Sequence, residues 1–149
     1  MTESKTIKTA KSFLEVVWGG ERPTDRALLA VVDTLLAVYH ETPKETTDEK
    51  KLQPPREDWK PLWDKVAKRF PDYGFYATID PLDMGGTPIF MVGDAIDDIA
   101  DITQDMRAMI WYDENLGPEY AHTFFRDFYF HWGEHARELS CYLFARIHK

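Results

Sequence analysis

DAIDDIADITQD, residues 94–105, is the stretch that decides the expected fold. At about 100° per residue of an α-helix, its aspartates fall within roughly a third of the circumference. The isoleucines of the same stretch, and the methionines that follow it, occupy the adjoining arc, so the acidic stripe borders a core-facing surface instead of lying opposite to it. The aspartates of the stripe are Asp94, Asp97, Asp98, Asp101 and Asp105.

The acidic stripe needs support from elsewhere in the protein. Like charges three or four residues apart cost roughly 0.2–0.5 kcal/mol per pair, which sums to roughly 1–2 kcal/mol over the stripe. Asp94 is placed to act as an N-cap, and Asp97 and Asp98 lie in the first turn, where the helix dipole favours negative charge. Asp101 and Asp105 have no such help, so we expect them to find donors or cations on another element.

A second stretch, HWGEH at residues 131–135, supplies imidazoles. It belongs to a last helix expected over 118–147, joined by a short turn to the acidic helix expected over 94–112. Two long helices joined by a short turn pack antiparallel. We therefore expect His131 and His135 to lie in the same seam as the aspartates.

The rest of the chain predicts an all-α fold, a bundle of about five helices with no strand pair. Apolar periodicity indicates three earlier helices over 4–18, 24–42 and 58–70. Residues 42–55 carry almost no apolar side chain and are expected to form a mobile loop. Residues 71–93 mix glycine and proline with aromatic side chains, which predicts a long irregular segment that covers the bundle or acts as a lid over a site, the cover being favoured.

Composition narrows the class of protein. A chain of 149 residues with 44% hydrophobic content fits one helical domain over 1–149, and a net charge of -8 opposes binding to nucleic acid or anionic lipid. The single cysteine, Cys141, excludes an intrachain disulfide and is expected to be a buried structural thiol. The sequence has no secretory signal at its start and no apolar run of the ~20 residues that span a bilayer, so we expect a cytoplasmic protein without membrane contact.

The two stretches resemble the signature of a bacterial family, domain of unknown function 5063. In that family an Asp-Asp-aliphatic-Ala-Asp-Ile segment and a further aspartate precede a helix with His-Trp-Gly-x-His. The matching residues here are 97–102 with Asp105, and 131–135. The resemblance is specific over 92–147 and implies that the two segments form one unit, but it brings no known activity.

Carboxylates and imidazoles facing each other can form a metal site. Mixed donors of this kind suit Mn, Fe or Zn. The alternative is a polar seam without an ion, in which the histidines donate hydrogen bonds to the aspartates, and the sequence favours this alternative. The candidate ligands are Asp98, Asp101, Asp105, His131 and His135.

Two further patterns are weaker. Residues 131–135 fit the inverted zinc-peptidase pattern, with Glu134 as the base, but only Glu138 follows where a distant glutamate ligand is needed. Glu119 and His122 match one Glu-x-x-His step of a di-iron bundle, of which the chain holds a single copy. Glu119 is better explained as an acid that complements the helix dipole.

Two functions from different classes remain open. The favoured one is a small acidic binding or regulatory module, such as an inhibitor, an immunity-type protein or an adaptor, in which Asp94, Asp97 and Asp98 engage a basic protein partner. The alternative is a hydrolase that uses the candidate metal site to activate water for a small substrate such as a phosphorylated one, with Glu134 as a possible base. The sequence favours binding because it shows no complete catalytic constellation.

Overall fold

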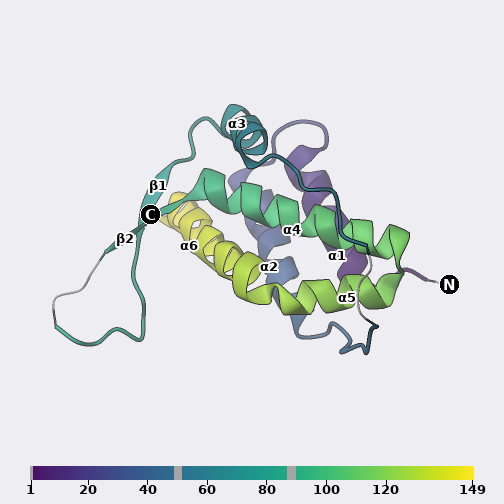
Figure 1. Cartoon of the computed structure of the whole chain (residues 1–149). Coiled ribbons are helices and arrows are strands. Elements are labelled where there is room, and N and C mark those ends of the chain that lie inside the picture. The colour runs from purple at the N-terminus through teal and green to yellow at the C-terminus, as the bar shows by residue number, and fades with distance from the viewer. Residues whose placement is uncertain (1, 49–51, 87–89) are drawn as a thin grey trace.

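The computed structural model describes residues 2–48, 52–86 and 90–149. Most of these residues are helical, which confirms the predicted helical bundle. Figure 1 shows α4 lying along α5 and α6, with α1 and α2 behind them and α3 at one edge. The helices are α1 (Lys5–Trp18), α2 (Asp25–Tyr39), α3 (Trp59–Arg69), α4 (Ala95–Asn115), α5 (Pro118–Asp127) and α6 (Glu134–His148), with a π-helical turn η1 (Tyr129–Gly133) between the last two.

Local sequence signals set several helix starts. The Ser4 and Thr24 side chains cap α1 and α2 by accepting hydrogen bonds from backbone N–H groups three residues on. Asp94 caps α4 as predicted, since its Oδ1 accepts from the backbone N–H of Ile96 at 3.0 Å. Pro118 occupies the first turn of α5, where its missing N–H costs nothing.

The acidic helix α4 is central to the packing. It contacts α1, α3, α5 and α6, while α2 closes the other side by packing on α1 and α6. Burial of a large apolar side chain contributes roughly 1.5–3 kcal/mol, so the shared core holds the two halves of the chain together. The largest fully buried side chains include Trp132, Phe13, Phe70, Phe125, Ile99, Ile102, Met106 and Met109.

The last helix is not continuous, contrary to the prediction over 118–147. It is interrupted by η1, where a Cβ at Gly133 would lie 2.5 Å from the Tyr129 ring. That ring is held in place by stacking on Tyr39 at a centroid distance of 3.6 Å. A π-turn inserts one extra residue into a helix and is frequent at functional sites. Periodicity misses it because apolar spacing on either side is preserved.

A two-stranded hairpin occupies the two ends of 71–93, so the expectation of no strand pair is wrong. Strands β1 (Phe75–Thr78) and β2 (Met91–Asp94) run antiparallel, with Tyr76 opposite Gly93. Strands of four residues are too short to show a period of two. In Figure 1 the residues that follow β1, up to 86, extend away from the bundle.

Only the first part of 71–93 covers the bundle. Tyr73 is buried and Tyr76 is half-buried against the core, whereas Leu82 and Met84 are 87% and 88% exposed. The predicted cover is therefore limited to the hairpin base. Residues 87–89 of the predicted segment, which include Ile89, lie outside the described residues.

The predicted loop over 42–55 has no helix or strand in 42–48 and 52–55, and 49–51 lie outside the described residues. Parts of it contact the bundle. The Thr42 hydroxyl is buried and bonded to that of Thr6 at 2.8 Å. Its mobility stays a prediction. In the described ranges, no helix has the length and apolar character needed to cross a bilayer.

Candidate metal centre

The seam between α4 and the η1–α6 segment brings the predicted aspartates and histidines together. His131 Nδ1 lies 2.7 Å from Asp105 Oδ2, and His135 Nδ1 lies 2.7 Å from Asp98 Oδ1. Both carboxylates belong to almost fully buried residues, Asp98 being 2% and Asp105 8% exposed. Each imidazole is therefore anchored from behind by a buried acceptor, which holds the proton on Nδ1.

Asp101 lies between the two rings, one turn from each anchoring aspartate. His135 Nε2 is 3.1 Å from Asp101 Oδ2, and His131 Nε2 is 3.7 Å from Asp101 Oδ1. One donor atom from each of the three residues can be chosen so that all lie within 4.8 Å of one another. The antiparallel helices thus interleave three carboxylates, spaced three and four residues apart, with two imidazoles spaced four apart.

These separations fit a shared metal ion. Ligands at about 2.1 Å from an ion lie about 3.0–3.4 Å from each other in octahedral or tetrahedral geometry. The two contacts of Asp101 with the histidines, 3.1 and 3.7 Å, are close to that range. Metal-binding histidines almost always donate the other ring N–H to a carboxylate or carbonyl, as both rings do here. Asp101, His131 and His135 therefore fit the ligand positions.

The structure gives the five predicted ligands two kinds of position. Asp98 and Asp105 use their carboxylates to hold the histidines at Nδ1, a position that suits orienting the rings, whereas Asp101 lies at the Nε2 side. Their spacing on the helix is the same as that of Asp101, and sequence alone could not separate the two roles.

Tyr76 is a residue of the site that the sequence reasoning missed. Its hydroxyl donates to Asp98 Oδ2 and lies 3.3 Å from Glu138 Oε2. The ring reaches this position by crossing the hairpin over Gly93, where an added Cβ would collide with it. The glycine directly before the Asp94 cap was the available signal, because a glycine inside a strand often marks a close approach.

The seam concentrates negative charge. Burial raises the pKa of both Asp98 and Asp105, although their hydrogen bonds from the histidines oppose the change. Burial, together with the charge of Asp101, raises the pKa of Asp97 to about 6. Carboxylates that resist ionisation mark a place where a bound cation would be stabilising.

The pKa of His135 is raised by the same cluster of carboxylates. Burial lowers its pKa, but the hydrogen bond that His135 donates to Asp98 and the charges of Asp101 and Asp98 outweigh burial and raise the pKa to about 9. In the metal-free protein this imidazole is therefore a cation at neutral pH. A metal ion would replace that proton at Nε2 and take over its role in neutralising the seam.

The site is partly open to solvent. The exposed fractions of the side chains are 35% for His131, 22% for His135 and 15% for Asp101. Three protein ligands leave at least one coordination position for water or substrate. This arrangement is typical of catalytic rather than closed structural metal sites.

The predicted acidic binding surface is reduced. Asp94 and Asp97 are partly exposed, but Asp98 is buried and cannot belong to a docking surface. Asp98 instead bonds to His135 in the seam. Helix position alone therefore overestimated how much of the acidic stripe is exposed.

The Glu-x-x-His pattern at Glu119 and His122 lies apart from the seam. His122 is 5% exposed, and its ring nitrogens contact Ser4 Oγ at 2.8 Å and Glu45 Oε1 at 3.2 Å. Glu119 is exposed in the first turn of α5, as expected for an acid that complements the helix dipole. This histidine connects α5 to the N-terminal segment and has a structural role.

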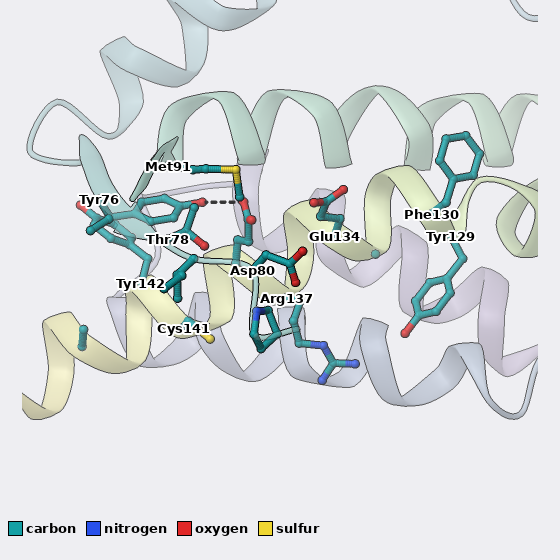
Figure 2. A pocket seen from close by; sticks show the side chains of 16 residues that line it. Tyr76, Thr78, Asp80, Met91, Tyr129, Phe130, Glu134, Arg137, Cys141 and Tyr142 are labelled. Atoms are coloured by element: carbon teal, nitrogen blue, oxygen red, sulfur yellow. Dashed lines mark hydrogen bonds between the residues drawn. The ribbon is translucent and has the colours of Figure 1, made fainter. Parts of the chain in front are cut away.

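A groove of about 810 Å³ lies beside the seam, between β1 with the residues after it and one face of α6. Figure 2 shows Tyr76, Asp80, Glu134 and Tyr142 among the side chains that line it. Cys141 also lines the groove and is exposed, so the prediction of a buried thiol is wrong. Its helix position borders the apolar face, and the neighbouring hairpin, which sequence did not predict, leaves that border open.

No family model and no curated protein matches the chain. Among solved structures, the crystal structure of protein BF1032 from Bacteroides fragilis is similar, with a TM-score of 0.65 and 18% sequence identity. The match covers 93% of this chain and 87% of that one. At this identity the likeness shows a shared fold and transfers no activity.

Proposed function

We propose that this protein binds one divalent transition-metal ion, Mn, Fe or Zn, through Asp101 and the Nε2 atoms of His131 and His135. One observation carries the proposal: each ring is anchored at Nδ1 by a buried carboxylate at 2.7 Å, while both Nε2 atoms face the same third carboxylate. This is the arrangement by which proteins fix the tautomer and direction of metal-binding histidines.

The ion-free seam explains only half of this geometry. The hydrogen bonds to Asp98 and Asp105 satisfy Nδ1 of each ring. At Nε2, the 3.7 Å contact of His131 is beyond hydrogen-bond range, and the 3.1 Å contact of His135 with Asp101 is an ion pair without hydrogen-bond alignment. Among the described residues neither Nε2 has a hydrogen-bond partner. A shared ion would replace these longer contacts with Asp101 by direct coordination at both Nε2 atoms.

The chemistry we propose for the ion is hydrolysis. A bound divalent ion lowers the pKa of its water and supplies a nucleophile at neutral pH. Glu134 precedes His135 directly, is exposed, and lines the adjoining groove, so it is the candidate base. The proposed location is the cytoplasm, where the exposed Cys141 stays reduced.

A second candidate function is a binding module for a basic protein partner. It is favoured by the segment that follows β1, where Leu82 and Met84 are 87% and 88% exposed beside Asp80 and Asp83. Exposed apolar side chains next to acids suit a partner that is both apolar and basic. The affinity for such a partner would fall steeply with salt.

Elemental analysis of protein purified without chelator tests the metal proposal. We expect about one Mn, Fe or Zn per chain, lost in Asp101→Asn and in His135→Ala. Glu119→Gln is the matched control, because Glu119 is exposed and distant from the seam in the chain. Wild-type protein that remains metal-free after incubation with each ion would overturn the proposal in favour of the hydrogen-bonded seam.

A further inference from the structure

The groove beside the seam runs along α6. Its lining on this side extends from Tyr129 in η1 to Ala145 in α6, which is roughly 24 Å at the rise of an α-helix. The opposite wall is formed by β1 and the residues that follow it, 76–81, with Met91 from β2. A cavity of about 810 Å³ is large enough for a small organic ligand.

The groove and the candidate metal centre share a border. Glu134 and Glu138 line the groove and lie one residue before and three residues after His135 on the same helix. The Tyr76 hydroxyl lies at the same border, donating to Asp98 behind His135 and lying 3.3 Å from Glu138 Oε2. A ligand in the groove would therefore lie along the edge of α6 that carries His135.

The lining combines aromatic walls with acids. The Tyr76 and Tyr142 rings pack at a centroid distance of 5.2 Å at one end, and Tyr129 and Phe130 line the other. The carboxylates come from both walls, and the rings offer negative faces to a cation. The acidic lining residues are Asp80, Glu134 and Glu138.

Arg137 is the basic residue among those that line the groove. In Figure 2 its guanidinium and the Glu134 carboxylate extend to opposite sides of α6. Burial and the charges of Asp98 and Glu134 raise the pKa of Glu138. Negative charge therefore dominates the side of the groove that adjoins the seam.

We infer that this groove holds the substrate of the candidate metal centre, and that the substrate is an organic cation, an ammonium or guanidinium group on an apolar body. The link to the metal rests on the proposed function; the preference for a cation rests on the groove alone. A phosphorylated substrate, which the sequence left open, would meet Asp80, Glu134 and Glu138 and be repelled.

Protection of Cys141 measures the charge preference. This thiol is the single cysteine of the chain and lines the groove, so its alkylation by iodoacetamide, followed by intact mass, reports occupancy. The probes are benzylamine, benzyl alcohol and benzoate, which share one ring and differ in charge. We expect benzylamine to slow alkylation at a concentration at least about tenfold lower than benzoate, with the alcohol between them. Equal protection by all three, or none by benzylamine, would overturn the charge preference.

Variants that remove one negative charge each test whether the acidic lining of the groove causes the preference for a cation. Glu138→Gln and Asp80→Asn are each expected to weaken protection by benzylamine roughly three- to tenfold and to leave that by benzyl alcohol unchanged. Glu114→Gln is the control, since Glu114 lies at the far end of α4 from the hairpin and is exposed. The same loss in the control would mean that net charge, and not the groove, attracts the amine.

Manganese-loaded protein tests the link to the metal. Bound Mn²⁺ first shows itself by enhanced relaxation of water protons; if it binds, we expect it to broaden the benzylamine proton signals as well. Enhanced water relaxation without ligand broadening would overturn the substrate assignment and leave the metal proposal standing. Absence of any Mn²⁺, Fe²⁺ or Zn²⁺ binding would remove the metal proposal and the substrate assignment with it, while the Cys141 measurement decides the cation preference separately.

Discussion

His122 lies at the contact of α5 with the N-terminal segment, whereas His131 and His135 lie in the seam between α4 and α6. Both regions bury imidazoles beside acids, but they use the ring nitrogens differently. His122 has separate protein partners at each nitrogen, Ser4 Oγ at 2.8 Å and Glu45 Oε1 at 3.2 Å. His131 and His135 each use one nitrogen for a buried carboxylate and present the other to Asp101.

The difference shows which property of a histidine indicates ligand binding. His122 is 5% exposed and both nitrogens have partners, so an ion would have to displace existing contacts. The seam histidines are 22% and 35% exposed at the side chain and offer two nitrogens to one point. Convergence of two ring nitrogens on one carboxylate, and not burial beside acids, separates the candidate site from the structural histidine.

The largest expected effect is on metal affinity, when one histidine from each region is replaced and the two variants are compared. His131→Ala should weaken metal affinity at least about a hundredfold, because it removes one of three ligands. His122→Ala should leave the affinity within about twofold once the folded fraction is accounted for. Isothermal titration with Zn²⁺ measures both, and a comparable loss in the two variants would mean that the seam is not the binding site.

The free energy of unfolding should depend on the buried Asp98 much more than on the partly exposed Asp97. Asp98→Ala leaves His135 Nδ1 and the Tyr76 hydroxyl without their acceptor, so we expect a loss of about 2–4 kcal/mol in the free energy of unfolding. Asp97→Ala, one position earlier, should cost less than about 1 kcal/mol. Urea denaturation of the chelator-treated variants measures both free energies of unfolding. Equal losses would show that the Asp98 contacts contribute little in solution.

A smaller effect is expected from the residue behind His131. Asp105→Asn keeps the shape of the anchor but removes its charge, and substitutions of such partners weaken metal affinity about 10–100-fold. Asp127→Asn, exposed at the end of α5, is the matched control and should change nothing. An unchanged affinity in Asp105→Asn would mean that the His131 ring needs no carboxylate at Nδ1. The carboxylate at Nδ1 would then no longer distinguish the seam histidines from His122.

The seam was predictable because helix periodicity alone places its residues. Asp98, Asp101 and Asp105 recur every three or four positions, as do His131 and His135, and a short turn forces the two helices together. The division of these residues into ligands and anchors depends on how far each side chain is buried. Spacing carries no information about that depth.

The hairpin and η1 could not be predicted for a different reason. Both depend on contacts between residues distant in sequence, the Tyr76 ring over Gly93 and the Tyr129 ring stacked on Tyr39 near Gly133. A glycine that admits a neighbouring ring looks, in sequence, like any helix-ending or loop glycine. The groove and the exposed Cys141 follow from these two features, so they were missed with them.

The smallest effect concerns pH. The carboxylates of Asp97, Asp98 and Asp101 on α4 raise the pKa of His135 to about 9 despite the opposing effect of burial. A histidine whose pKa is higher in the folded state stabilises fully below its unfolded pKa, about 6.5, and loses that contribution as pH rises through the folded value. We expect metal-free protein to lose on the order of 1–2 kcal/mol between pH 6.5 and 9.5 by this route, because solvent screens part of the interaction.

The pH effect belongs to His135 only if a variant removes it. His135→Asn keeps a donor near Asp98 but cannot take up a proton, so its stability should be flatter over the same window, measured by urea denaturation in parallel. Other groups that titrate over this window are present in both proteins and cancel in the difference. Stability that rises with pH in the wild type relative to the variant would mean that His135 is neutral in the folded protein. His135 would then act in the seam as a neutral hydrogen-bonding group, and the ion pair with Asp101 would not contribute.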